Sequence, residues 1–370
     1  MSQITPITMP KWGLSMTEGK VVEWLAEEGQ RLTPGDPVMD IETEKIANTF
    51  EALDAGTLRR RIAAVDDVLP IGALLGVLAD ESVSDDAVDA FVTEFQASYV
   101  PPAPEEGDSG PVYQWADAGG YRLRYSLRGE SGPSVVLIHG FGGDLDNFLF
   151  NHDALAAKAR VYALDLPGHG QSSKDVRDPS VAGLAAAVLA FMDTLGITSA
   201  HLVGHSLGGA IALQAASSAP GRVSSLSLLA PAGLGTAING SYLRGFVAAE
   251  SRKELKPLLQ QLVANPDLVN RQMVDDMLKF KRTDGVATAL AAIADGFCSG
   301  DAQKVVLRDA LATLACPVQV IWGERDAIIP VDQAAGLPAA VRTEVLPGIG
   351  HLLHLEAANA VNALLLRQLG

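Results

Sequence analysis

A serine flanked by glycines is the first feature of this sequence that could carry out chemistry. Ser206 is the central residue of Gly204-His205-Ser206-Leu207-Gly208, a G-x-S-x-G pentapeptide. The apolar run HLV precedes the pentapeptide, and the helix-like run GGAIALQAASSA follows its leucine. This context predicts a sharp strand-to-helix turn that exposes the serine hydroxyl, with small neighbours that let the strand and helix approach closely. The sequence therefore predicts that Ser206 is a nucleophile.

A serine hydroxyl needs a base to become nucleophilic, and the base needs a carboxylate that fixes its tautomer. Asp326 lies just beyond the apolar run VQVIWG, and loops at strand ends of open α/β sheets are where functional groups gather. His351 follows the next strand-like run, in a glycine-rich loop ahead of a helix. We predict His351 as the base and Asp326 as its carboxylate, with His354 and Glu324 as the nearby alternatives. No further ligands accompany the His-x-x-His pair, so we predict no metal site.

The segment His139-Gly140-Phe141-Gly142-Gly143 follows the apolar run VVLI. A flexible glycine-rich loop in this place can direct an amide toward the negative oxygen of a tetrahedral intermediate. We predict that the backbone amides of Phe141 and Leu207 form this oxyanion hole, and that His139 braces the loop. The later run DLPGHG, residues 165–170, is interpreted as a loop-shaping turn.

Lys45 is a second candidate for chemistry. It ends the segment Glu42-Thr43-Glu44-Lys45 between two strand-like runs, which suits a tight hairpin turn. A lysine at such a tip points into water, where a modifying enzyme can reach it and an attached arm can visit several active sites. Taken alone, a lysine in a polar turn is ordinary surface.

The elements that position these residues fall into two parts, because 370 residues are too many for one ordinary domain. From Thr5 to Ala79, short alternating runs are separated by Gly, Pro and Asp turns about every eight to ten residues, a pattern typical of small all-β domains. We place this domain at residues 1–80. Residues 81–111 follow as an acidic helix, with Val88, Phe91, Val92 and Phe95 at helical spacing, and a Pro/Glu/Gly linker.

From residue 112 to 370 apolar strand runs alternate with longer helical runs. This alternation predicts parallel βαβ units in a doubly wound sheet. Between about residues 235 and 311 only amphipathic helical segments occur, such as SRKELKPLLQQLVA and RQMVDDMLKF, and no strand run. We therefore expect a helical cap inserted into an α/β domain.

Composition excludes several classes of partner. A net charge of −16 and a pI near 4.8 argue against nucleic acid, which needs a clustered basic surface. The tight basic run at 59–61 is interpreted as a solvated face. Two cysteines are too few for a disulfide framework and fit a reducing cytoplasm. The sequence contains no signal-like amino terminus and no long apolar span, so we expect neither secretion nor a membrane partner.

The all-β domain contains the segments Met9-Pro10, Glu18-Gly19, Glu28-Gly29, Pro34-Gly35-Asp36, Glu42-Thr43-Glu44-Lys45 and Gly56. With these segments, residues 5–80 resemble the lipoyl domains of 2-oxo acid and acetoin dehydrogenase complexes. Related biotinyl domains carry Met-Lys-Met at the hairpin tip, whereas Glu44 and Ile46 flank the lysine here. The resemblance implies lipoate covalently attached to Lys45 by a lipoate ligase or lipoyl transferase. Residues 63–67 depart from the family, which often has a glycine-containing turn there.

Residues 112–370 are similar to α/β hydrolases at five motifs in the family's order. These are the loop at 139–143, the turn at 165–170, the serine pentapeptide, and the segments around Asp326 and His351. The resemblance implies an α/β-hydrolase fold with a helical cap. It also implies a catalytic triad of Ser206, Asp326 and His351, in the chain order of that family.

Together the two parts resemble the acyltransferase component of bacterial acetoin dehydrogenase complexes. This implies a multienzyme complex with a thiamine diphosphate-dependent component and a dihydrolipoyl dehydrogenase, in which acetyl passes from lipoyl-Lys45 to coenzyme A. The chain lacks the His-x-x-x-Asp-Gly motif of better-known acyltransferases, and we assign the transfer to Ser206. Two alternatives stay open: an α/β hydrolase (thioesterase, esterase or C–C bond hydrolase) tethered to the carrier, or a non-catalytic scaffold.

Overall fold

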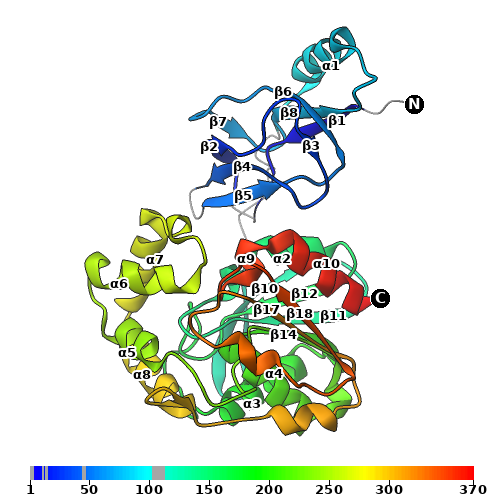
Figure 1. Cartoon of the computed structure of the whole chain (residues 1–370). Helices are drawn as coiled ribbons and strands as arrows, with labels where there is room; N and C mark the ends of the chain where they lie inside the picture. Colours follow the sequence, from blue (N-terminus) through cyan, green and yellow to red (C-terminus); the bar gives the residue numbers. More distant parts are fainter. Residues whose placement is uncertain (1–3, 11, 13–15, 44–46, 102–112) are drawn as a thin grey trace. The chain divides into compact units, whose positions relative to one another are not determined.

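The chain divides into two compact units, Met1–Pro111 and Val112–Gly370. The computed structural model describes residues 4–10, 12, 16–43, 47–101 and 113–370, and Figure 1 draws the whole chain. Each unit has its own buried apolar side chains. Lys45 and its neighbours Glu44 and Ile46 lie outside the described residues.

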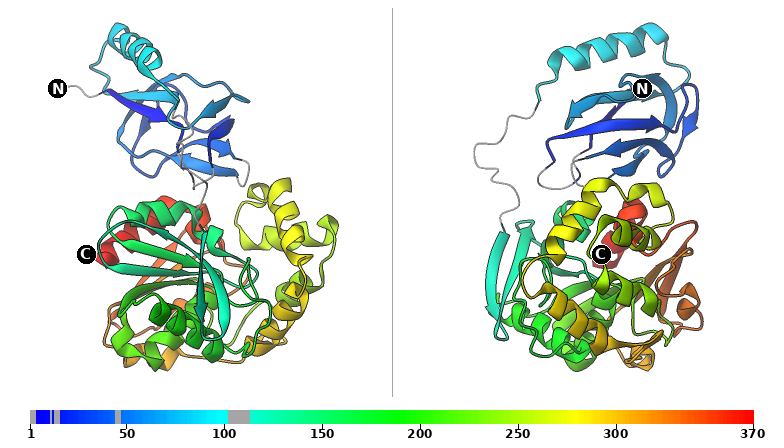
Figure 2. Two further views of the ribbon diagram at one scale, coloured as in Figure 1. Left: turned by 180° about the vertical axis from the view of Figure 1, so that it is seen from behind. Right: turned by 90° about the vertical axis from the view of Figure 1, so that its left-hand side faces the viewer.

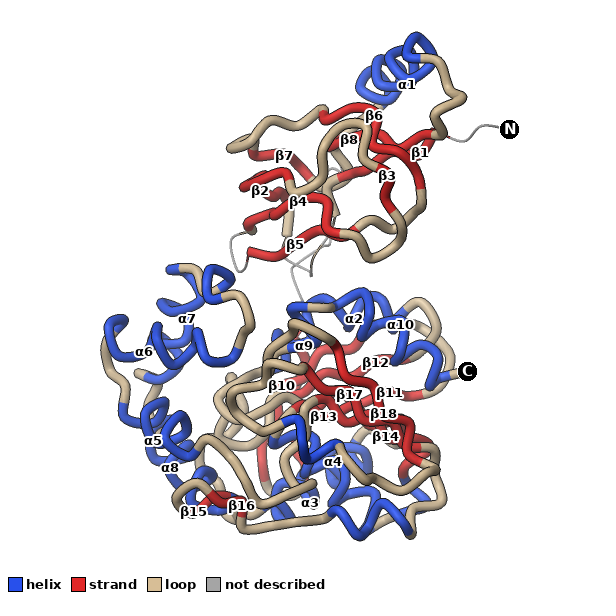
Figure 3. The backbone as a smooth tube through the Cα atoms, viewed as in Figure 1, coloured by secondary structure: helices blue, strands red, loops and turns tan. Residues whose placement is uncertain are grey.

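The first unit is built from two antiparallel four-stranded sheets, with orders β1-β8-β6-β3 and β5-β4-β2-β7. Alternating side chains of both sheets, Val21, Ile41 and Leu58 among them, are fully buried in one shared core. This arrangement confirms the predicted all-β domain (Figure 3). The strands are β1 (Ile4–Thr8), β2 (Glu18–Trp24), β3 (Arg31–Leu32), β4 (Pro37–Glu42), β5 (Ala47–Glu51), β6 (Gly56–Arg61), β7 (Val68–Pro70) and β8 (Leu74–Ala79).

The turn before β7 contains an aspartate in a backbone conformation that favours glycine. Asp66 has a φ of 73°, in the left-handed region that favours glycine. Its carboxylate lies 2.7 Å from the Nζ atom of Lys20 on β2, and its amide donates to the Val21 carbonyl. Local bonds therefore hold the backbone conformation that a glycine would adopt without strain.

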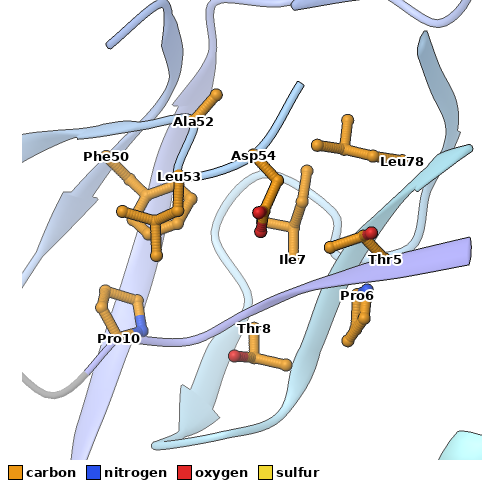
Figure 4. Close-up of a pocket in the computed structure, with 10 residues that line it drawn as sticks. All are labelled: Thr5, Pro6, Ile7, Thr8, Pro10, Phe50, Ala52, Leu53, Asp54 and Leu78. Carbon is orange, nitrogen blue, oxygen red and sulfur yellow. The ribbon is translucent and has the colours of Figure 1, made fainter. Parts of the chain in front are cut away.

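A pocket opens along β1 of this unit, between residues of β5 and β8 (Figure 4). Its walls are mainly apolar, with Asp54 as the acidic side chain. Leu53 lines it and remains 65% exposed to solvent. The residues around it are Thr5, Pro6, Ile7, Thr8, Pro10, Phe50, Ala52, Leu53, Asp54 and Leu78.

Helix α1 (Asp85–Ser98) packs on the first unit through its apolar face, with fully buried Val88 at the centre of the contact. Phe91, Val92 and Phe95 flank Val88 against side chains of β8, as their helical spacing indicates. Ser84 caps the amino terminus of the helix, and its hydroxyl accepts a hydrogen bond from the Ala87 amide.

The interpretation of residues 59–61 as a solvated face is wrong, because all three arginines are only partly exposed and make contacts within the unit. The guanidinium of Arg59 binds the carboxylate of Asp85 at 2.7 Å and also donates to the carbonyls of Asp80 and Val83. Arg60 binds Asp89 at 2.9 Å. The acidic first turns of α1 thus neutralise these arginines, and the basic run fixes the helix.

The second unit contains an eight-stranded sheet of order β18-β17-β14-β13-β11-β12-β10-β9. Six strands of this sheet are parallel to one another: β11, β12, β13, β14, β17 and β18. At one edge, β10 pairs antiparallel with β12 and with the edge strand β9. The bounds are β9 (Tyr113–Ala118), β10 (Tyr121–Arg128), β11 (Ser134–Ile138), β12 (Arg160–Leu164), β13 (Ala200–His205), β14 (Val223–Leu229), β17 (Val318–Gly323) and β18 (Val341–Leu346).

Helices cover both faces of this sheet, as the doubly wound prediction requires (Figure 1). Helices α3 (Val181–Thr194) and α4 (Leu207–Ser218) pack together against β9, β13 and β14, and α2 (Leu149–Ala156) packs with α10 (Ala358–Leu369) near β12 and β14. Short helical turns complete the layer: η1 (Leu145–Phe148), η2 (Pro220–Arg222), η5 (Arg308–Ala312), η6 (Val331–Ala334) and α9 (Leu353–Glu356).

The predicted helical cap is present beside the sheet, as the two views of Figure 2 show in yellow and yellow-green. One detail differs from the prediction: a minimal hairpin of β15 (Cys298–Ser299) and β16 (Ala302–Gln303) ends the cap. Two-residue strands are too short to leave an alternating pattern in the sequence. The helical elements are α5 (Gly240–Ala248), α6 (Arg252–Leu259), η3 (Gln260–Leu262), η4 (Pro266–Leu268), α7 (Arg271–Lys281) and α8 (Val286–Phe297).

The packing of α1 on β8 can be tested with Val88→Asp. An unpaired carboxylate cannot be buried at this fully covered position, so we expect α1 to detach while the two sheets stay folded. Amide hydrogen exchange should show that the protection factors of α1 fall by at least about tenfold, which corresponds to a loss of about 1.4 kcal/mol in the free energy of opening. The protection factors of β4 should stay unchanged. Glu94→Ala, on the exposed face of the same helix, is the control. Unchanged protection of α1 in Val88→Asp would contradict the packing.

Candidate functional site

Ser206 occupies a sharp turn between the last residue of β13 and the first residue of α4. Its φ of 53° and ψ of −118° are values that non-glycine residues rarely adopt. Backbone bonds on both sides hold this conformation: its amide donates to the Leu229 carbonyl, and its own carbonyl accepts from Gly209 and Ala232. The turn has the geometry that the serine pentapeptide predicts.

Two glycines make this turn sterically possible. A Cβ atom on Gly204 would lie 2.2 Å from the carbonyl oxygen of Gly208, and one on Gly208 would lie 2.1 Å from that of Ile138. Both distances are shorter than any real contact and involve backbone atoms that cannot move aside. Strand β13, helix α4 and strand β11 therefore approach one another only because these positions lack side chains.

Asp326 and His351 form a buried pair at the ends of β17 and β18. The Nδ1 atom of His351 lies 2.7 Å from Oδ2 of Asp326, and the two side chains are 3% and 0% exposed. The other carboxylate oxygen, Oδ1, accepts hydrogen bonds from the amides of Ile328 and Ile329 at 2.8 and 3.0 Å. Because the carboxylate is held on both sides, it accepts a hydrogen bond from the Nδ1–H group and favours the tautomer whose Nε2 atom carries no proton.

The indole of Trp322 was not identified from the sequence. Its Nε1 atom donates to Oδ2 of Asp326 at 3.0 Å, as well as to the Ile329 carbonyl. A fully buried tryptophan at the end of an apolar strand, four residues before an aspartate, is the signal that could have indicated it. Trp322 fixes the orientation of the carboxylate and supplies one more hydrogen bond to it.

His205 connects the serine to the histidine loop. Its Nε2 atom donates to the backbone carbonyl of His351 at 3.0 Å, and the two rings lie 4.7 Å apart. Since His205 precedes Ser206 directly, this bond connects the serine turn to the loop that carries the predicted base. Burial lowers the pKa of His205 well below its usual value, which keeps the ring neutral.

The two alternative residues have other surroundings. Glu324 is exposed and accepts from the Gly348 amide. His354 is fully buried, and within the described part of the chain neither of its ring nitrogens has a hydrogen-bond partner. Burial lowers its pKa to about 3, and its ring packs 4.4 Å from that of His205. The structure therefore places Asp326 with His351 and leaves these two residues outside the pair.

The glycine-rich loop after β11 lies directly beside the serine. A Cβ atom on Gly140 would approach Cβ of Ser206 to 3.0 Å. Among the described residues, the amides of Gly142 and Gly143 are engaged within the protein, but no hydrogen bond is found for those of Phe141 and Leu207. These two amides are therefore available for a ligand oxygen, as the oxyanion-hole prediction requires.

Buried imidazoles brace this loop. His139 donates from Nδ1 to the Gly140 carbonyl and accepts from the Leu166 amide at Nε2. His169 accepts the amide of Gly142 at 3.1 Å. Burial is the main cause that lowers the pKa of both rings, so each keeps the unprotonated nitrogen that accepts a bond. The bracing role predicted for His139 and for the turn at 165–170 agrees with these contacts.

The cap also contacts the loop. The ring of Phe141 packs edge-on against Phe246 of α5 at 5.9 Å and lies at the same distance from Phe297 of α8. A Cβ atom on Gly142 would meet the Phe246 ring at 2.6 Å. The cap therefore packs against the loop that carries the predicted oxyanion amide.

Lys45 lies outside the described residues, between two strands that are described. β4 and β5 pair antiparallel, and the register pairs Glu42 with Ala47. Four residues thus connect the two strands, which fits the hairpin predicted for this segment.

Among the residues that the structure describes, no group of three or more His, Cys, Asp or Glu side chains could hold a metal ion, and no helix is both long and apolar enough to span a bilayer.

Comparisons with known proteins match both units. The family described as alpha/beta hydrolase fold matches residues 133–358, and the biotin/lipoyl family, described as Biotin-requiring enzyme, matches residues 5–78. A solved meta-cleavage product hydrolase from Pseudomonas fluorescens superposes with a TM-score of 0.63 over 69% of this chain and 96% of its own. Its sequence identity is 23%, so it supports the fold alone.

Two relatives match along nearly the whole chain. The acetyltransferase component of the acetoin cleaving system of Pseudomonas putida is 52% identical, over 98% of this chain and 97% of its own length. Its counterpart from Cupriavidus necator is 50% identical, over 99% and 98%. Both carry the name dihydrolipoyllysine-residue acetyltransferase. The chain belongs to this family, the acetyltransferase components of acetoin cleaving systems, with a lipoyl domain ahead of an α/β-hydrolase-fold domain.

Proposed function

We propose that Ser206 carries the acetyl group during transfer from the lipoyl arm to coenzyme A, with His351 as the base and Asp326 as its orienting carboxylate. The observation that carries this proposal is the strained serine turn joined through His205 to the carbonyl of His351. Strained backbone is retained where the surrounding structure enforces it, and it clusters at active sites.

In the first half of the reaction, the hydroxyl oxygen of Ser206 attacks the carbonyl carbon of an acetyl thioester. Nε2 of His351 takes the hydroxyl proton as the C–O bond forms. The C–S bond then breaks, and the departing sulfur receives that proton from His351. The product of this half is a free thiol and an acetyl ester on Ser206.

The second half reverses these roles with a new thiol. Nε2 of His351 takes the proton of the coenzyme A thiol, whose sulfur attacks the acetyl-serine carbonyl carbon. The C–O bond breaks, and the proton returns to the serine oxygen. Acetyl-coenzyme A leaves, and no water enters the overall balance. The choice between thiol and water as acceptor separates a transferase from a hydrolase on the same fold.

Charge that develops on the carbonyl oxygen requires donors in both halves. The amides of Phe141 and Leu207 are our candidates, and Leu207 is the first residue of α4, where helix amides and the helix dipole favour negative charge. Removal of one such donor typically reduces transition-state stabilisation by about 3 kcal/mol. A Cβ atom on Gly140 would lie 3.0 Å from Cβ of Ser206, and this proximity of the loop to the serine supports the role proposed for the Phe141 amide.

Lys45 is the proposed attachment point of the lipoyl group, which supplies a dithiol that carries the acetyl as a thioester. Partners in this proposal are a thiamine diphosphate-dependent component that loads the arm, a dihydrolipoyl dehydrogenase that reoxidises it, and the ligase or transferase that attaches lipoate. The cytoplasm remains our predicted location.

Ser206→Ala tests the serine intermediate. Lipoylated, acetylated full-length protein is mixed with coenzyme A, and acetyl-coenzyme A and acetate are both measured. We expect acetyl-coenzyme A formation to fall by at least about a thousandfold, because loss of a triad serine removes most of the catalysis. Ser217→Ala, at an exposed residue of α4 whose hydroxyl donates to the Leu213 carbonyl, is the control.

Three other outcomes would contradict the proposal. Undiminished transfer by Ser206→Ala would exclude the serine as the carrier. Acetate in place of acetyl-coenzyme A from the native protein would favour the tethered hydrolase. Failure of a fluorophosphonate probe to label Ser206 would favour the scaffold.

Lipoylation at Lys45 is tested by intact mass spectrometry of the protein from its native cells. We expect one lipoyl mass increment on the native chain and none on Lys45→Arg, since the arginine guanidinium cannot form the amide bond. Lys20→Arg, on β2 of the same unit, should keep the increment. An increment that survives in Lys45→Arg would place the modification elsewhere.

A further inference from the structure

The middle of the cap is fastened to the loop that carries His351. We define the cap strap as residues 260–264, which include η3 and the two residues after it. The amide of Leu352, next to His351, donates to the carbonyl of Leu262 at 3.0 Å. A Cβ atom on Gly350, on the other side of His351, would lie 2.7 Å from the amide nitrogen of Ala264. The strap and the loop are thus in direct backbone contact on both sides of the predicted base.

Glu356 bridges these two segments with its carboxylate. Oε2 accepts the amide of Ala264 in the strap at 2.7 Å, and Oε1 accepts the amide of Gly350 in the loop at 3.1 Å. Glu356 itself is the last residue of α9, which begins at Leu353. One carboxylate therefore holds the cap strap and the residue before His351 in a fixed relation. Amides paired with a charged acceptor form stronger hydrogen bonds than amides paired with neutral groups.

A second fastening joins the strap to the loop that carries Asp326. The side-chain amide of Asn239, which caps α5, donates to Oε1 of Gln261 in the strap and to the carbonyl of Ala327, both at 3.1 Å. The backbone amide of Asn239 also donates to the Ile328 carbonyl. Both partners of the buried Asp326–His351 pair are thus connected to the same five-residue segment of the cap.

We propose that Glu356 is a positioning residue for His351, and that it makes the alignment of the base depend on the docked position of the cap strap. This inference rests on the proposed function, in which His351 moves protons to and from Ser206. Glu356 contacts only backbone amides in the contacts described above, so it acts through the loop and not on the reacting atoms. A substrate that shifts the cap would in this way adjust the base.

Charge around Glu356 gives the coupling a pH dependence. Burial raises the pKa of this carboxyl above its usual value; the two amides and His351 lower it in part, and Asp326 raises it again. As the pH falls through this raised pKa, the carboxyl takes a proton and loses an acceptor for one of its amides. This loss makes wild-type activity decline at a higher pH than it would without the carboxyl group.

Glu356→Gln in the full-length, lipoylated protein is the test. The amide nitrogen of glutamine cannot accept a hydrogen bond, so one of the two bonds is lost with little change in volume. We expect kcat for acetyl-coenzyme A formation to fall by about tenfold to a hundredfold, as small misplacements of a catalytic group do, with little change in KM. The acid limb of the pH profile should move to lower pH, a shift that general destabilisation would not produce.

Two matched variants separate the possible causes. Glu356→Asp keeps the charge but is too short to reach both amides, so kcat should fall without the shift of the acid limb. Glu324→Gln alters a neighbouring carboxylate that accepts the Gly348 amide at 2.9 Å, and it should leave kcat and the pH profile as in the wild type. If Glu356→Gln fails to fold, the same kinetic measurements on Glu356→Asp test the inference.

Labelling by a fluorophosphonate probe gives a second measurement that does not depend on acyl transfer. The probe reacts with a serine that an aligned His351 activates. If Glu356 aligns His351, labelling of Ser206 should be slower in Glu356→Gln by a similar factor. Unchanged labelling, kcat and pH profile in both Glu356 variants would overturn the inference, as would an equal effect of Glu324→Gln. Failure of the proposed function is recognised separately, because Ser206→Ala would then retain transfer.

Discussion

The buried hydrogen bond between His351 and Asp326 is the contact around which the second unit is arranged. At 2.7 Å, with both side chains almost without exposure, it fixes which imidazole nitrogen is free. A carboxylate in such a place needs further donors to offset its lost hydration, and Trp322, Ile328 and Ile329 supply them. Those donors come from β17 and from the loop that follows it, so the sheet edge, the loop and the pair are built as one structure.

Much of this arrangement could be predicted from short segments of the sequence. The alternating runs located most of the strands, and the G-x-S-x-G pentapeptide located the turn that holds Ser206 in its left-handed conformation. Local patterns suffice there because the residues that matter are adjacent in the chain. The choice of His351 over His354 as the partner of Asp326 followed from the same loop-and-helix reasoning, and the structure pairs these two side chains.

Contacts between distant segments could not be predicted in this way. Glu356 meets Ala264 across 92 residues, and Arg59 meets Asp85 across 26. Each of these charged residues is ordinary in its own segment, and only the folded chain shows that its partner is a distant backbone amide or a carboxylate on a helix. The basic run at 59–61 was misinterpreted for this reason. Likewise, the hairpin after α8 is made of two strands of two residues each, which are too short to leave a periodic signal in the sequence.

The neutral imidazoles that brace the loops have a consequence for the behaviour of the protein in acid. An unfolded histidine has a pKa near 6.5, and burial lowers that value in the fold. Below about pH 6.5 the unfolded chain therefore binds protons that the buried rings of the native protein do not bind. Each such ring reduces the free energy of unfolding by up to about 1.4 kcal/mol per pH unit. Acid should therefore destabilise the second unit. The rings concerned are His139, His152, His169, His205 and His354.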